Sequence, residues 1–230
     1  MSTRAQLYAD LVRRRCTPQA RQWWEAVLTL NPAFSPGAEF LRAYSKAARM
    51  LGNASLEVEH EEVAADVMAW LLPFQQRPVH ELGRTALVLR AFEVWPPEEP
   101  VKFIDELFVR GDNAEREALL RTLPMLPDAG RFSVTAVEAC RTNVLTVFDA
   151  IACENPYPAR YFSELHFNQL VMKALFIGVS LRRIVCLSER ITPGLRRMVR
   201  DHVKERTVAD RPVHADTKLI LNPLVTSGIR

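Results

Sequence analysis

The sequence predicts an all-α protein of about ten short helices, stacked as degenerate helix pairs in a HEAT/armadillo-like α-solenoid or packed into a compact helical domain. Two observations support this prediction. Apolar residues recur at helical spacing along almost the whole chain, and no convincing stretch alternates as a strand would. The 15 prolines mark the boundaries between one periodic segment and the next. No linker divides the chain, so we expect a single domain over residues 1–230.

The composition is that of an ordinary globular protein, with 48% hydrophobic and 25% charged residues. The net charge of +3 is too small to require nucleic acid as a partner. The N-terminus lacks the apolar core of a signal peptide, and the longest apolar stretch, 170–181, is shorter than the roughly 18 residues of a membrane span. We therefore predict a cytoplasmic protein without a transmembrane segment. Four cysteines are interpreted as reduced core thiols: Cys16, Cys140, Cys153 and Cys186.

The first helices are predicted from proline and capping signals. One helix covers about residues 3–15, and Thr17-Pro18 begins the next, because proline is tolerated in a first helical turn. Ser35-Pro36 opens a third helix, which closes near Gly52. A fourth is expected to begin in the acidic run 57–62, because carboxylates favour a helix N-terminus.

The middle of the chain follows the same logic. Pro78 opens a fifth helix that ends at Trp95, and Pro100 opens a sixth that ends at Gly111. Asp112 is a suitable cap for the seventh. An eighth helix of about 20 residues is predicted from an i, i+3/i+4 apolar stripe that ends at Ile151.

The last third begins with a proline-rich turn and a helix predicted over residues 160–177. A short helix is expected over 180–190, and a basic helix begins near Thr192-Pro193. The final stretch, 212–225, is less regular and is predicted to lie across the helices as a tail.

The helix predicted over residues 160–177 is apolar around most of its circumference, which is typical of a central helix packed on several sides. We therefore expect Phe176 to be fully buried. On a helical wheel, with about 100° per residue, two lines of polar residues interrupt this apolar surface. The first line is Arg160, Glu164 and Asn168, and the second is His166, Gln169 and Lys173.

These polar residues admit two interpretations. In the first interpretation they are structural: Arg160 and Glu164 pair at i, i+4, and the side-chain amides hydrogen-bond to neighbouring backbone groups. Alternatively they line an internal cleft with the preceding turn as its lip. The candidate ligand-binding residues are Asn155, Tyr157, Arg160, Glu164, His166, Asn168, Gln169 and Lys173.

The segment "NPYPARYFSELHFNQLVMKALFIGVSLRRI", within a region of about 154–184, resembles the signature of the EboA family. The resemblance rests on the Asn-Pro-Tyr-Pro turn at 155–158, the aromatic pair Tyr161-Phe162, and Phe167-Asn168-Gln169 ahead of Lys173. Serine at position 163 departs from the proline that is more usual there. The first half of the chain carries no recognised motif.

The resemblance implies a pathway rather than a reaction. EboA-like proteins are encoded in bacterial gene clusters for a secondary metabolite. Their neighbours there resemble a UbiA-type prenyltransferase, a sugar-isomerase-like barrel, a TatD-like metal hydrolase and a dehydroquinate-synthase-like cyclase. The expected partners are therefore pathway proteins of the same cluster or a small metabolite. The resemblance brings no catalytic residue to this chain.

Motifs for metal or cofactor chemistry are absent from the sequence. The five histidines form no HxH or HExxH pair, and the acidic first turn explains the run EHEE at 59–62. With 8 glycines, the chain has no Gly-rich phosphate loop, and it has no GxSxG motif. We expect no cofactor and no metal.

The C-terminal quarter is basic. One face of its predicted helix carries Arg196, Arg197, Arg200 and Lys204. This face is either simply solvated or attracts a phosphorylated intermediate, an acidic partner or membrane headgroups. Nucleic acid is the weakest of these partners, because no nucleic-acid-binding motif accompanies the charges.

Two functions from different classes follow. The first is a non-enzymatic helical-repeat binding or scaffold protein that supports biosynthesis or transport of a secondary metabolite, and this reading is favoured. The second is an enzyme of unusual helical type acting on a pathway intermediate in a cleft around residues 164–173. There Glu164, His166 and Lys173 would form an acid/base set.

Overall fold

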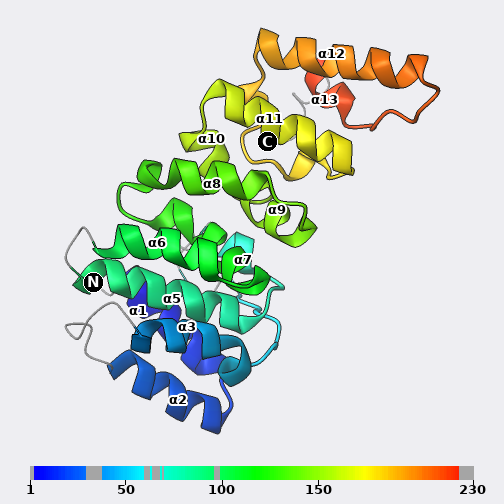
Figure 1. Ribbon diagram of the computed structural model, residues 1–230. Helices are drawn as coiled ribbons and strands as arrows, with labels where there is room; N and C mark the ends of the chain where they lie inside the picture. The colour runs from blue at the N-terminus through cyan, green and yellow to red at the C-terminus, as the bar shows by residue number, and fades with distance from the viewer. Residues whose placement is uncertain are drawn as a thin grey trace. The chain divides into compact units, whose positions relative to one another are not determined.

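The computed structural model describes residues 3–29, 38–59, 63, 68, 70–95 and 99–222. In these ranges the secondary structure is helical, and the only extended pairing is an isolated bridge between Ser55 and Pro78. The all-α prediction is therefore confirmed. The chain divides into two compact units, residues 1–150 and 151–230, which are described separately (Figure 1).

Helix α5 forms the centre of the first unit. This helix, Val79–Val94, packs against α1 (Arg4–Arg15), α3 (Ala38–Leu51) and α7 (Asn113–Thr122), which surround it in Figure 1. Most of its residues are buried, on all sides. Gly83 permits the close approach of α3, because a Cβ at this position would lie 2.4 Å from a methyl group of Leu51. The remaining helices of this unit include α2 (Pro18–Thr29) and α6 (Glu99–Arg110).

Several predicted helix boundaries are confirmed by local hydrogen bonds. The Thr3 hydroxyl accepts from the Gln6 N–H and caps α1. Gly52 ends α3 in the left-handed region, with φ 78°. Asp112 and Glu115 form a reciprocal capping box at the start of α7, in which each side chain accepts from the other's backbone N–H.

A helix was predicted to start in the acidic run 57–62. This prediction is wrong for the part of the run that the structure describes. Residues 52–59 are not helical. The Leu56 N–H donates to the Arg77 carbonyl oxygen at 2.6 Å, and the Gln75 amide bonds both backbone groups of Val58. These bonds hold the segment against residues 75–79 and exclude a helical path. Residues 60–62 lie outside the described part.

The prediction of one eighth helix of about 20 residues is also wrong. Two helices stand in its place, α8 (Ser133–Cys140) and α9 (Leu145–Ala152). Between them the Thr142 hydroxyl accepts from the Val144 N–H at 3.1 Å, which gives the backbone an alternative to the helical bond. The described part of the first unit also contains three short 3₁₀ turns: η1 (Leu72–Phe74), η2 (Leu123–Met125) and η3 (Ala129–Phe132).

The second unit is built on two neighbouring helices, α11 (Glu164–Ile177) and α12 (Pro193–Val208), with α13 (Thr217–Leu221) packed on α12 (Figure 1). The two long helices run in the same direction, because the start of α11 approaches Gly194 while Phe176, near its end, contacts His202. The predicted short helix over 180–190 is wrong. Two 3₁₀ turns occupy this region, η4 (Leu181–Arg183) and η5 (Ser188–Arg190).

The helix predicted over residues 160–177 is interrupted. Short α10 (Tyr157–Tyr161) ends before Phe162, and Ser163 caps the new helix α11 by accepting from the His166 N–H. Arg160 therefore does not share a helix with Glu164, and the expected first polar line is broken. Phe176 is 62% exposed, so the expectation that it is buried is wrong. The helix that is buried on all sides is α5.

Candidate functional site

The polar residues of α11 lie in different environments. Asn168 is buried, with 5% of its surface exposed. Glu164 and Gln169 are exposed, and His166 and Lys173 are half-buried. This helix therefore carries one deeply buried amide among polar residues that reach solvent.

Asn168 belongs to a group that we call the α11–α12 polar cluster: Glu164, Asn168, Thr192 and Gly194. The Thr192 hydroxyl donates to Glu164 Oε1 at 2.7 Å and accepts from the Leu195 N–H at 3.2 Å. Thr192 is thus the N-cap of α12 and also joins α12 to α11. A Cβ at Gly194 would lie 2.9 Å from Glu164 Oε1 and 3.8 Å from Asn168 Nδ2, so a glycine permits this approach.

Within the described part of the chain, the buried side-chain oxygen of Asn168 has no hydrogen-bond donor. Leaving a buried acceptor unsatisfied costs about 1–3 kcal/mol. Such an atom calls for a donor, which a water molecule or an O–H or N–H group of another molecule can supply. The neighbouring Glu164 carboxylate supplies a second acceptor at the solvent-facing side of the cluster.

The Asn-Pro-Tyr-Pro residues have a structural role. Asn155 is 2% exposed, and its Oδ1 accepts from the Tyr157 N–H at 2.9 Å, which shapes the turn into α10. Tyr157 is fully buried beside Tyr161 and Phe162, and burial raises the pKa of its phenol above the usual range. These two predicted ligand-binding residues build the turn ahead of α11.

Two members of the expected acid/base set, Glu164 and His166, have contacts that lead in different directions. Glu164 bonds to Thr192 on α12, whereas the His166 ring packs edge-on to Phe162, with centroids 6.3 Å apart. The two residues are two positions apart, about 200° around the helix. The structure thus brings Glu164 together with Asn168, and it places His166 on another side of α11.

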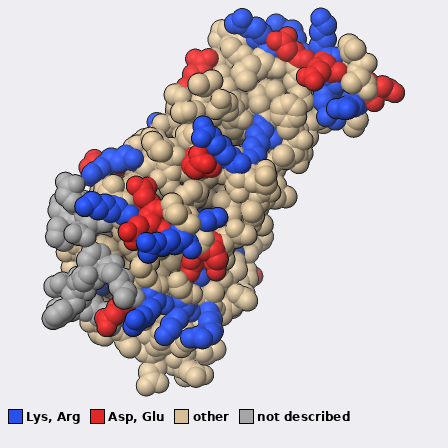
Figure 2. All heavy atoms as spheres, viewed as in Figure 1, with Lys and Arg blue, Asp and Glu red and all other residues tan. Residues whose placement is uncertain are grey.

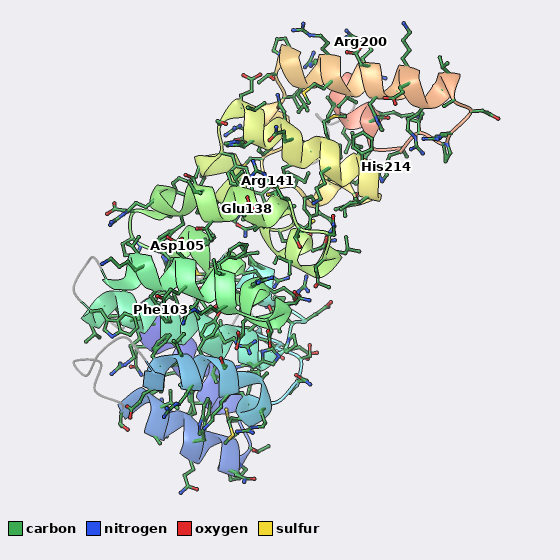
Figure 3. The ribbon with its side chains drawn as sticks, in the orientation of Figure 1. Phe103, Asp105, Glu138, Arg141, Arg200 and His214 are labelled. Carbon is green, nitrogen blue, oxygen red and sulfur yellow. The ribbon has the colours of Figure 1, made fainter. Side chains whose placement is uncertain are left out.

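Helix α12 carries the predicted basic residues on its outer side. Arg197, Arg200 and Lys204 are exposed and Arg196 is half-buried. Figure 3 shows the Arg200 side chain pointing away from the helix pair. The same figure labels Glu138 and Arg141, whose ion pair at 2.8 Å in the first unit is an ordinary exposed one.

The first unit contains a buried ionic network that was not predicted from the sequence. Arg121 on α7 contacts Glu81 on α5, and Arg84 on α5 donates through Nε to the Tyr44 carbonyl oxygen at 3.0 Å. His80 Nδ1 lies 3.4 Å from Arg84 Nη1. The signal was present, because His80, Glu81 and Arg84 interrupt an otherwise apolar helical stretch as the polar residues of α11 do.

Burial dominates the titration of this network. It raises the pKa of Glu81 and lowers that of Arg121, in spite of their mutual attraction. Burial and the nearby charge of Arg84 lower the pKa of His80 to about 4, so its imidazole is neutral at physiological pH.

The core prediction for the cysteines agrees with the burial of Cys16 and Cys153, and Cys140 is half-buried. It is wrong for Cys186, which is exposed. Among the residues that the structure describes, no three His, Cys, Asp or Glu side chains form a group that could hold a metal ion. No described helix combines the length and apolarity needed to cross a membrane.

Comparison with known proteins places the chain in a family. The family model described as "Metabolite traffic protein EboA" matches residues 4–221, and this description implies a role connected with metabolite traffic. No curated protein and no solved structure matches the chain. Because the match spans both units and includes the signature segment, the chain belongs to the EboA family.

Proposed function

We propose that the chain is a non-enzymatic binding protein in metabolite traffic, which takes up a small metabolite at the α11–α12 polar cluster. The observation that carries this proposal is the buried side-chain oxygen of Asn168, which has no donor within the described part of the chain. A ligand that donates a hydrogen bond would remove the cost of that unsatisfied acceptor.

The cluster suits a particular class of ligand. Asn168 Oδ1 and the Glu164 carboxylate both accept hydrogen bonds, so the matching group is a hydroxyl, an amide N–H or an amine. A carboxylate on the ligand would meet the negative charge of Glu164. The proposed metabolite is therefore neutral or cationic where it enters the cluster.

A binding role is favoured over catalysis because two members of the candidate acid/base set, Glu164 and His166, do not converge. Glu164 is held by Thr192, and His166 faces Phe162. General acid–base catalysis needs the two groups within reach of one substrate.

The proposal extends to the cellular role. The chain would support biosynthesis or transport of a bacterial secondary metabolite, in contact with proteins of the same gene cluster. Residues 1–230 would act as one helical-repeat domain. The all-α fold and the family match support this extension.

The test compares two leucine substitutions on one helix. Asn168→Leu keeps the side-chain size and removes the acceptor, whereas Gln169→Leu changes an exposed amide next to it. Each protein is co-produced with its cluster neighbours and examined by native mass spectrometry and by extraction of bound small molecules. The wild type and Gln169→Leu should retain a small molecule that Asn168→Leu has lost. Asn168→Leu should remain folded and be at least as stable as the wild type.

A second variant probes the same cluster from α12. Gly194→Ala places a methyl group against the flexible end of Glu164, so it should shift the carboxylate at little cost in stability and weaken retention. If Asn168→Leu retains the same molecule as the wild type, or if the wild type carries none, the cluster is structural and the proposal is wrong.

A further inference from the structure

We propose that the outer face of α12 docks the chain onto membranes that contain anionic lipids. This basic face consists of Arg196, Arg197, Arg200 and Lys204. The proposal concerns where the chain is held, and it goes beyond the metabolite site at the α11–α12 polar cluster.

The fold holds the basic face outward. Three of its residues follow one another at four-residue spacing, Arg196, Arg200 and Lys204, and therefore lie along one line of the helix. The opposite side of α12 is fixed in the second unit by the buried residues Leu195, Val199 and His202. The helix cannot rotate to hide its charges without exposing that apolar side.

The cations of this face are not used by the fold. Within the described part of the chain, none of the four side chains makes an ion pair or a hydrogen bond. Other cations of the second unit do have internal partners. Arg183 pairs with Glu154 at 2.8 Å, and Arg190 donates to two carbonyl oxygens, those of Ala159 and Phe162. The charge of α12 is thus available to an external anion.

Positive charge is concentrated in this part of the chain. Residues 151–230 contain thirteen Lys and Arg against seven Asp and Glu, a net charge of +6. Residues 1–150 contain seventeen Lys and Arg against twenty Asp and Glu, a net charge of −3. Figure 2 shows blue side chains along α12, with the red carboxylates of the same helix among them. An anionic surface would therefore attract the second unit in preference to the first.

The shape of the face favours a membrane over a single phosphorylated ligand. A helix surface is convex, and the line from Arg196 to Lys204 extends about 12 Å at 1.5 Å per residue. One phosphate group cannot contact all of these cations, but neighbouring lipid phosphates can, and arginine binds phosphate in a two-pronged geometry. Val208, at the end of the same face, is 81% exposed, and its apolar side chain suits the boundary between headgroups and acyl chains.

The test measures binding to vesicles of phosphatidylcholine with and without phosphatidylglycerol, by flotation at low and at moderate salt. Wild-type protein should bind only the phosphatidylglycerol vesicles, and added salt should weaken the binding. Each basic residue near an anionic surface strengthens binding by about fivefold. Arg196→Glu with Arg200→Glu should therefore weaken binding by at least about 25-fold.

The matched control lies on α3, where Arg42 and Lys46 are also exposed and four residues apart. Arg42→Glu with Lys46→Glu changes the net charge equally and should leave vesicle binding within about twofold of wild type. Arg196→Lys with Arg200→Lys should retain most of the binding. Circular dichroism and thermal unfolding establish that all variants are folded.

Three results would overturn the proposal. The first is absence of wild-type binding to phosphatidylglycerol vesicles at low salt. The second is an equal loss of binding in the α3 and α12 double variants, which would mean that only net charge matters. The third is binding of double-stranded DNA that depends on Arg196 and Arg200 while the vesicles remain unbound.

Discussion

Arg121 and Glu81 form an ion pair inside the first unit, with Nη1 2.9 Å from Oε2 and side chains that are 2% and 4% exposed. They join α7 to α5, the helix at the centre of that unit. The second terminal nitrogen of Arg121 is buried and has no hydrogen-bond partner within the described residues. The pKa shifts of both groups indicate that desolvation outweighs their attraction. We therefore expect the pair to act as a specific connection rather than as a large source of stability.

Breaking this pair from one side should be costly. Arg121→Met leaves a buried carboxylate without its cation, and Glu81→Leu leaves the buried guanidinium with only the more distant contact to Glu117 at 4.0 Å, so each should lower the free energy of unfolding, by about 3–5 kcal/mol for Arg121→Met and by less for Glu81→Leu. The double variant buries neither charge and should lie close to wild type or above it. Urea unfolding of the four proteins measures the cycle. Additive losses in the double variant would contradict this account of the pair.

His80 should make the stability of the first unit depend on pH. Its pKa is about 4 in the folded chain, below the value of about 6.5 expected when unfolded. The unfolded chain therefore binds the proton more readily, and the contribution of neutral His80 is complete above about pH 6.5 and is lost as the pH falls toward 4. The loss should reach up to about 3 kcal/mol. His80→Gln should show a smaller decrease in unfolding free energy between pH 7 and pH 4, and an unchanged decrease would exclude His80 as the cause.

Two phenylalanines of α11 should differ sharply in their contributions to stability. Phe176 is 62% exposed and touches the His202 ring, with centroids 4.7 Å apart, so Phe176→Ala should cost less than about 1 kcal/mol. Phe167 is fully buried, and Phe167→Ala should cost about 3–5 kcal/mol. Chemical denaturation of both variants gives the comparison. Equal losses would mean that the exposed end of α11 is covered in solution.

Asn155 should contribute to stability through the turn that its side chain forms. Its Oδ1 accepts from the Tyr157 N–H, so Asn155→Ala leaves a buried donor unsatisfied and should cost about 1–3 kcal/mol, whereas Asn155→Asp keeps an acceptor and should cost less. Asn143 is exposed, and Asn143→Ala serves as the control. Thermal unfolding distinguishes these outcomes. A loss in Asn143→Ala as large as that in Asn155→Ala would contradict a special role for the turn.

The sequence by itself determined the all-α class and those helix boundaries that depend on neighbours in the chain. Thr3, Asp112 and Thr192 cap helices by accepting from N–H groups three residues later, so a short stretch of sequence contains the whole interaction. The signature segment likewise identified the family, which the match over residues 4–221 confirmed.

The tertiary structure alone decided which helix is central and which polar groups meet. Both α5 and α11 are apolar helices interrupted by polar residues, and the periodicity of either one cannot show how many neighbours surround it. Glu81 pairs with Arg121, forty residues away, and Asn168 lies beside Gly194 of another helix. Helical periodicity indicates only which residues share a face of one helix. These contacts depend instead on packing between helices, and the residues that meet there lie far apart in the chain.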